Sequence, residues 1–225
     1  MCGRYGRWSR KQRLEILLGL IPSPESDEFE RYNIVPGTHP WIVRKNSDDG
    51  VTIDSCLWGL VPFGSKNPNA RVRPINAIAE TAHEKPMFRE LIRERRCLIP
   101  ADCFYEWKAT PVGKIPYCIR MADNEPFFFG GLWDEWHEGR DDAISFTILT
   151  TTPNELTAQI HNRMPVIVRA EDYGHWLDPN VRDTEKISEV FLPFPAEEMR
   201  AYPVSHRVND AKNEGRELIQ AASFL

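Results

Sequence analysis

The stretch that decides the fold runs from residue 97 to residue 133 and reads CLIPADCFYEWKATPVGKIPYCIRMADNEPFFFGGLW. Its runs of β-branched and aromatic residues are separated by turn formers such as Pro111, Gly113 and Asn124. Neighbouring strands that are joined by such short connections pair antiparallel. We therefore expect a ladder of strands at 97–99, 103–108, 117–121, 126–133 and 145–150.

Short helices are expected around this sheet. Ser9 is a candidate N-cap for a first helix in which Leu14, Leu17, Leu18 and Ile21 recur at core-facing spacing. The pattern predicts an α+β fold, a single domain over residues 1–225 with a mainly antiparallel, barrel-like sheet and short flanking helices. Further helices are expected near 79–83, 86–95, 153–160 (capped by Thr152), 171–177 and 184–191, and further strands at 41–43, 52–58, 166–168 and 199–204.

Charge and cysteine usage narrow the class of protein. The net charge of −5 argues against bulk attraction to duplex DNA, so a nucleic-acid partner would need a local basic groove. The five cysteines include no Cys-x-x-Cys pair, which predicts free thiols in a reducing compartment and no metal site. With no signal-peptide pattern and no apolar run of about 18 residues, we expect a cytoplasmic protein (nucleoid-associated if bacterial) without a membrane partner or cofactor.

Cys2 is the first candidate catalytic residue. Removal of Met1, which is common before a small residue, would leave an α-amine and a thiol on adjacent carbons. The unperturbed pKa values of these groups are about 7.7–8.0 and about 8.5, so both have a nucleophilic form near neutral pH. An aldehyde would form an imine and then a thiazolidine ring, and the same pair could instead attack an acyl group. The ordinary interpretation is an incidental cysteine near a chain end.

Glu106 is the second candidate. Strand alternation puts it on one face with Phe104 and Lys108. A carboxylate among aromatic residues can have a raised pKa and act as a general acid. The alternative is a Glu on the solvent face that pairs with Lys108.

His161, Arg163 and Asn76 complete the candidates. His161 either caps the helix expected at 153–160 or acts as an acid–base catalyst beside a phosphate-binding Arg163. Asn76 follows a Pro-rich loop, where turn-forming Asn is common. None of these signals decides the function alone, and their joint order along the chain carries more information.

That order resembles one known family. The motifs concerned are Met1-Cys2-Gly3-Arg4, Trp58-Gly59-Leu60-Val61-Pro62, Asn76, Ala101-Asp102-Cys103-Phe104-Tyr105-Glu106-Trp107, Ile160-His161-Asn162-Arg163-Met164-Pro165, and Pro203-Val204-Ser205 followed by Asn213. Together they resemble the SRAP family (SOS response-associated peptidases, or abasic-site processing proteins) over essentially the whole chain. The combination of the Tyr-Glu-Trp and His-x-Arg-Met-Pro segments with the Met-Cys-Gly-Arg start is highly specific.

The resemblance implies a chemistry. The family folds as one α+β domain with a groove for single-stranded DNA. Cys2, freed of Met1, would form a thiazolidine with the ring-opened aldehyde of an abasic site, a covalent DNA–protein crosslink that protects the site during repair or replication. Glu106 matches the acid that assists sugar ring opening, and the activity would be of DNA-lyase or crosslinking type. The family's peptidase name reflects removal of its own N-terminal residues.

The resemblance also implies roles for the other candidates. Asn76 matches the residue that holds the reacting N-terminus and sugar, and His161 the residue that assists proton transfer. Arg4 and Arg163 match positions that contact DNA phosphates. No cofactor or metal is implied, the partner is single-stranded DNA with abasic sites, and a monomer is expected.

This chain departs from the family pattern at two places. Ile78 stands where many relatives carry a phosphate-binding Arg, a role that Arg71 or Arg73 could take over. The aromatic wedge that often follows the Trp-Gly-x-x-Pro segment is reduced to Phe63 before Gly64. Two other functions stay open on the sequence: an N-terminal-nucleophile peptidase or amidohydrolase that acts on proteins or small amides, and a non-catalytic binding module.

Overall fold

Two sheets form the framework of the computed structural model, which describes residues 2–24, 30–46, 50–65, 73–138 and 141–222. The five-stranded sheet has the order β14 (Met199–Pro203), β9 (Gly113–Met121), β8 (Cys103–Thr110), β1 (Tyr5–Arg7) and β2 (Arg31–Ile34). The nine-stranded sheet follows the path β12 (Met164–Pro165), β11 (Asp141–Thr151), β10 (Phe127–Glu138), β7 (Arg96–Ala101), β3 (Trp41–Lys45) and β4 (Val51–Ser55). The remaining strands of this sheet are β13 (Ile167–Val168) beside β10, and β5 (Leu57–Trp58) and β6 (Asn76–Ile78), both beside β11.

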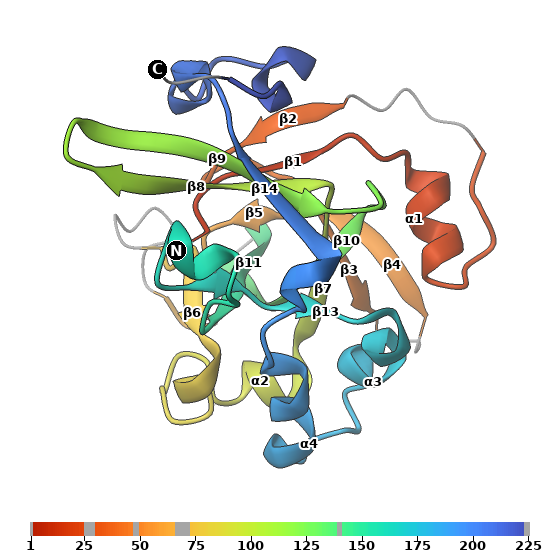
Figure 1. Ribbon diagram of the computed structural model, residues 1–225. Coiled ribbons are helices and arrows are strands. Elements are labelled where there is room, and N and C mark those ends of the chain that lie inside the picture. Colours follow the sequence, from red (N-terminus) through yellow and green to blue (C-terminus); the bar gives the residue numbers. More distant parts are fainter. Residues whose placement is uncertain (1, 25–29, 47–49, 66–72, 139–140, 223–225) are drawn as a thin grey trace.

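The sheets curl into a half-barrel (Figure 1). Most neighbours pair antiparallel, as the short connections predict, whereas β5 and β6 run parallel to β11. The long β8–β9 hairpin extends beyond the rest of the sheet (Figure 1). The predicted α+β class with a barrel-like, mainly antiparallel sheet is therefore confirmed.

The helices are short and lie around the sheets. In Figure 1, α2, α3 and α4 gather on one side and α1 lies apart from them. None of the helices in the described ranges has both the length and the apolar character that crossing a membrane would require. The α-helices are α1 (Lys11–Leu17), α2 (Leu91–Glu94), α3 (Tyr173–Leu177) and α4 (Thr184–Ser188). The 3₁₀ turns are Ala79–Thr81, Thr157–Gln159, Ala170–Asp172, Glu189–Phe191, Ala196–Glu198, His206–Asn209 and Arg216–Ile219.

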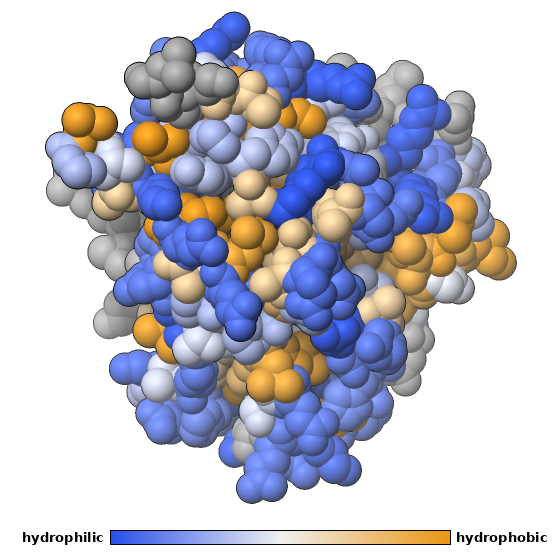
Figure 2. All heavy atoms as spheres, in the orientation of Figure 1, coloured by the Kyte–Doolittle hydropathy of each residue, from blue (hydrophilic) through white to orange (hydrophobic). Residues whose placement is uncertain are grey.

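Aromatic residues fill the interior of the half-barrel. The Tyr5 ring lies 5.3 Å from that of Trp58 and 5.7 Å from that of Phe129, measured between centroids. Trp58 also stacks on Phe146 at 6.3 Å. A second cluster lies between the nine-stranded sheet and the helices, around the fully buried Trp176. On the face shown in Figure 2, hydrophilic residues predominate and hydrophobic residues form small, separate groups.

Several local predictions were wrong. Ser9 does not cap α1, because its hydroxyl donates to the Asp102 carboxylate and Arg10 is the residue that precedes the helix. Ile21 is 93% exposed and lies beyond the end of α1. The helix expected at 86–95 is reduced to α2, since the residues before it form successive turns.

The helix expected at 153–160 is also shorter than predicted. Only Thr157–Gln159 is helical, as a 3₁₀ turn. The Asn154 side chain, rather than that of the expected Thr152, binds the start of this turn, because the Thr157 N–H donates to Asn154 Oδ1 at 2.9 Å. The strands β1, β2, β6 and β12 were not foreseen, because each is too short to show a period.

Asp102 fastens the N-terminal segment to the barrel. Its side chain is buried, and its carboxylate accepts from the Trp8 N–H at 2.6 Å, the Ser9 N–H at 2.8 Å and the Ser9 hydroxyl at 2.5 Å. A buried donor that loses its acceptor costs more free energy than the net worth of an ordinary hydrogen bond. The start of the chain is therefore held by one side chain between β7 and β8.

Asp102→Ala should lower the free energy of unfolding by about 3 kcal/mol, because it leaves several donors without their acceptor. Urea denaturation followed by tryptophan fluorescence measures this change. Asp123→Ala is the matched control, since the Asp123 carboxylate also accepts a backbone N–H, from Glu125 at 2.9 Å, but is exposed. An equal loss in both variants would contradict the role given to Asp102.

Candidate functional site

The pairing of β1 with β8 brings Cys2 near Glu106. Tyr5 lies opposite Phe104, and the Tyr105 N–H donates to the Arg4 carbonyl at 3.0 Å. Continued toward the N-terminus, this register puts the residues before Arg4 level with Glu106. Alternation on β8 is as predicted, since Phe104 faces the half-barrel interior while Tyr105 packs in a separate cluster on the other face. Glu106 shares the face of Phe104 and is itself buried.

Asn76 reaches the same place from a third segment. It begins β6, which pairs parallel with β11 so that Asn76 lies opposite Ile148. Its Nδ2 donates to the Cys2 carbonyl at 2.8 Å. Its Oδ1 is buried and has no hydrogen-bond partner among the described residues, so this oxygen can accept a further donor. The turn interpretation of Asn76 is wrong, because the residue starts a strand.

The thiol of Cys2 is enclosed. The side chain is 0% exposed, belongs to the aromatic core cluster, and its Sγ donates weakly to the Arg4 carbonyl at 3.9 Å. Burial raises the pKa of the Cys2 thiol well above its ordinary value, and the charge of Glu106 raises it further. The thiol is therefore protonated at neutral pH. The structure covers the Cys2 side chain completely.

His161 lies in a segment that packs against the same core. The residues that flank its segment, Ile160 and Met164, belong to the hydrophobic cluster that contains Cys2. The Arg163 N–H donates to His161 Nδ1 at 3.1 Å. An N–H group can only donate, so Nδ1 accepts in this contact, and in a ring that carries one proton this puts the proton on Nε2; the Arg163 carbonyl also lies 3.3 Å from the same Nδ1.

The Arg163 side chain is engaged by protein groups. Its Nη1 and Nη2 donate to the two carboxylate oxygens of Glu80 at 2.8 and 2.7 Å, and Nη2 also donates to the Thr150 carbonyl. The Arg163 side chain is only 19% exposed. The phosphate contact expected of Arg163 stays a prediction, and any such contact must share a guanidinium that Glu80 already holds.

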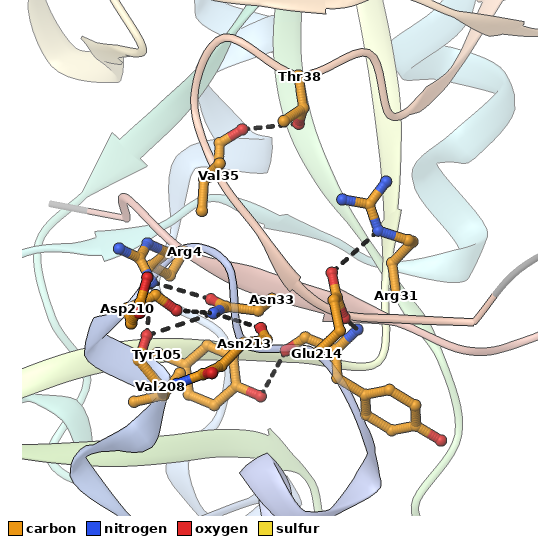
Figure 3. Close-up of polar contacts among 11 residues, drawn as sticks. Arg4, Arg31, Asn33, Val35, Thr38, Tyr105, Val208, Asp210, Asn213 and Glu214 are labelled. Carbon is orange, nitrogen blue, oxygen red and sulfur yellow. Dashed lines mark hydrogen bonds and ion pairs between the residues drawn. The ribbon is translucent and has the colours of Figure 1, made fainter.

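Arg4 is likewise built into the fold. Its Nη1 donates to Asn33 Oδ1 at 2.9 Å and to the Val208 carbonyl at 2.6 Å, and its Nη2 donates to the Asn209 carbonyl at 3.1 Å. Partial burial lowers the pKa of Arg4, against the opposing effect of Asp210. Figure 3 shows Arg4, Asn33, Val208 and Asp210 gathered between β2 and the C-terminal segment. A phosphate contact of Arg4 also stays a prediction.

Asn33 and Glu80 are the residues that sequence reasoning missed. Asn33 is buried and its Nδ2 donates to the carbonyls of Asp210 and Asn213 at 2.9 and 3.0 Å (Figure 3). Nothing in their local sequence marks either residue, because their partners lie many residues away. Because no strand was expected over residues 31–34, a buried Asn there could not be anticipated.

The two departures from the family pattern lie on the surface. Ile78 is 48% exposed and Phe63 is 70% exposed. Arg73 packs against Gly59, whose φ of +132° and Cβ position 3.2 Å from the Arg73 Cβ explain the glycine after Trp58. Arg71 lies outside the described residues. Within the described ranges, no group of three or more His, Cys, Asp or Glu could hold a metal ion.

Comparison with known proteins gives a consistent result. Residues 1–211 match the family model described as SOS response associated peptidase (SRAP). The chain is 36% identical over 224 residues to abasic site processing protein YoqW of Bacillus subtilis, covering 98% of this chain and 100% of that protein. It is 37% identical over 212 residues to abasic site processing protein YobE of the same organism, covering 93% and 96% of the two chains. A crystal structure of a protein from Bacteroides thetaiotaomicron superposes with a TM-score of 0.82 at 29% identity, covering 99% and 100% of the two chains.

Enclosure of Cys2 predicts low reactivity in a chain that retains Met1. With an N-terminal extension that keeps Met1 in place, iodoacetamide at pH 8 should leave the Cys2 thiol unmodified, because burial and the Glu106 charge suppress the thiolate. Intact mass and peptide mapping measure the modification. Glu106→Gln should speed alkylation of Cys2 several-fold. In the unfolded chain, iodoacetamide should modify all five cysteines. Rapid modification of native Cys2 would contradict its burial.

Proposed function

The chain belongs to the SOS response associated peptidase (SRAP) family, and on that premise we propose that it processes abasic sites in DNA by covalent capture through Cys2. Two relatives similar over nearly their whole length are named abasic site processing proteins, which supports the substrate. The observation that carries the proposal is the meeting of three segments: Cys2 is held through its carbonyl by Asn76 and lies within the electrostatic influence of Glu106.

Removal of Met1 is the first step of the proposal. Self-cleavage of the Met1–Cys2 bond consumes one water, frees the α-amine of Cys2 and removes the residue that precedes the enclosed thiol. The amine then attacks the aldehyde of a ring-opened abasic sugar, and one water leaves as the imine forms. Addition of Sγ to the imine carbon closes the thiazolidine, while the thiol proton reaches the ring nitrogen. The net condensation loses one water and needs no oxidant or metal.

The order of attack follows from the protonation of the thiol. Because burial keeps the thiol neutral, the amine is the nucleophile that meets the aldehyde first. The Glu106 carboxylate can take the proton of the anomeric hydroxyl and return it to the sugar ring oxygen as the hemiacetal opens, and it can then carry the thiol proton to nitrogen as the second ring closes. The aldehyde is the minor form of the sugar, so a proton-transferring group at this position speeds its formation. Asn76 holds residue 2 in place, which makes both attacks intramolecular.

His161, Arg4 and Arg163 complete the proposed site. The Arg163 N–H holds His161 through Nδ1, which leaves Nε2 as the nitrogen that would take part in proton transfer to a leaving oxygen and in the reversal of the crosslink. Single-stranded DNA suits a chain of net charge −5, because a few guanidinium groups and aromatic walls suffice to bind it. We assign the protein a monomeric, single-domain form in this reaction.

Cys2→Ala should abolish a heat-stable adduct between the protein and a single-stranded oligonucleotide with one abasic site. Intact mass spectrometry and denaturing gels measure the adduct and report Met1 loss in the same sample. Cys56→Ala is the matched control, since Cys56 is equally buried in the same core cluster, and it should retain the adduct. An adduct of undiminished yield with Cys2→Ala would refute capture through this residue.

The peptidase alternative is tested with the same proteins. If the wild-type chain turns over general peptide or amide substrates and gives no adduct with abasic DNA, the N-terminal-nucleophile hydrolase is the correct function. Adduct formation without peptide turnover favours abasic-site capture. Retention of DNA binding without either activity would identify a non-catalytic module.

Glu106→Gln should slow adduct formation by about 100-fold, since loss of a general acid–base group typically costs that much or more. Quenched time courses with abasic single-stranded DNA measure the rate. The same substitution should speed alkylation of the Cys2 thiol, so the two readouts move in opposite directions. Glu125→Gln, an exposed partner of Arg13, is the control. A wild-type adduct rate in Glu106→Gln would remove its acid–base role.

A further inference from the structure

Glu80 joins three segments that are far apart in the sequence. It follows β6, the strand that begins with Asn76. Its two carboxylate oxygens accept from Arg163 Nη1 and Nη2, and the same guanidinium donates to the carbonyl of Thr150 on β11. β11 lies between β6 and β12 at this level, since Thr150 pairs with Ile78 on one side and with Pro165 on the other. The Glu80–Arg163 pair therefore bridges across the end of β11.

The Glu80–Arg163 ion pair is bidentate. Two parallel N–H···O bonds fix the guanidinium plane relative to the carboxylate, which a single contact would not do. Hydrogen bonds from Arg163 hold the pKa of the Glu80 carboxyl below its usual range, so Glu80 is ionised and the pair intact at neutral pH. An ion pair whose carboxylate is 40% exposed contributes little net stability. Its main physical effect is to fix the direction in which the 161–163 segment leaves the core.

Arg163 transmits this constraint to His161. Its side chain is fixed by Glu80 and Thr150, and its own backbone N–H donates to His161 Nδ1 at 3.1 Å. The Arg163 carbonyl lies 3.3 Å from the same ring nitrogen. A rotation of the Arg163 peptide would present this carbonyl to Nδ1 in place of the N–H and would move the proton from Nε2 to Nδ1. Holding the Arg163 side chain opposes that rotation.

We propose that Glu80 is a positioning residue that, through Arg163, fixes the His161 ring in the Nε2–H tautomer. The part of this inference that concerns reaction rate rests on the proposed function, whereas the part that concerns the tautomer does not. Arg163 then acts mainly as a strut between Glu80 and His161. This role is separate from the proposed phosphate contact of Arg163, which would have to share the guanidinium with Glu80.

The test compares Glu80→Ala, Glu80→Asp and the control Glu84→Gln. Glu84 is an exposed neighbour in the same turn region, so its neutralisation removes the same charge without touching Arg163. ¹⁵N-detected NMR of the imidazole, assigned with His161→Gln, reports the tautomer. Glu80→Ala should give a mixture of tautomers, whereas the wild type and Glu84→Gln should show Nε2–H alone. Glu80→Asp keeps the charge and should restore most of the wild-type signal.

Rates and affinities give the second readout. At saturating abasic single-stranded DNA, Glu80→Ala should slow adduct formation about tenfold, as expected when a proton donor is misaimed, while Kd for the DNA stays within about twofold. Glu84→Gln should leave the rate unchanged. The melting temperature of Glu80→Ala should fall by no more than about 4 °C, so a folding defect would be visible separately.

Three outcomes distinguish the proposals. An unchanged tautomer in Glu80→Ala overturns the positioning role. Tighter DNA binding by Glu80→Ala at a wild-type rate also overturns it, because Glu80 would then restrain a phosphate-binding Arg163. If the wild type forms no adduct at all, the proposed function fails, while a tautomer change in Glu80→Ala still supports the positioning of His161.

Discussion

The antiparallel pairing of β1 with β8 is the constraint on which the site depends. It places β1 between β8 and β2 of the five-stranded sheet, and the same register continued toward the N-terminus puts Gly3, the neighbour of Cys2, opposite Glu106. Asp102 fastens the strand on one side by accepting from Trp8 and Ser9. Chain ends are ordinarily mobile unless they are tied down. Here the β1–β8 pairing and the Asp102 contacts hold the end that carries the proposed reacting groups.

Enclosure of Cys2 has two consequences for chemistry. It keeps the thiol protonated, and a covered, protonated thiol is a poor nucleophile. It also shifts the first nucleophilic step of the proposed reaction to the amine. The same low-dielectric surroundings that suppress the thiolate strengthen the effect of the Glu106 charge on the Cys2 thiol.

Both arginines near the site serve the architecture. Arg4 joins β2 to the C-terminal segment through Asn33 and backbone carbonyls, and Arg163 joins the His161 segment to Glu80. In a protein of net charge −5, guanidinium groups that already bind acceptors within the protein add little positive potential at the surface. An incoming phosphate would have to share them with existing acceptors. Affinity for DNA would then come from few contacts, and the covalent step would supply the persistence of the proposed complex.

Sequence alone determined the α+β class and the main strands β7 to β11, because long alternating segments with Pro, Gly and Asn turns favour one pairing pattern. The ordered motifs also identified Cys2, Asn76, Glu106 and His161 as candidates. Only the tertiary structure decided that β1 and β6 are strands, that Cys2 is enclosed, and that Asn33, Glu80 and Asp102 hold the site segments. These features depend on contacts between residues about 70 to 180 positions apart, and such contacts leave no local period in the sequence.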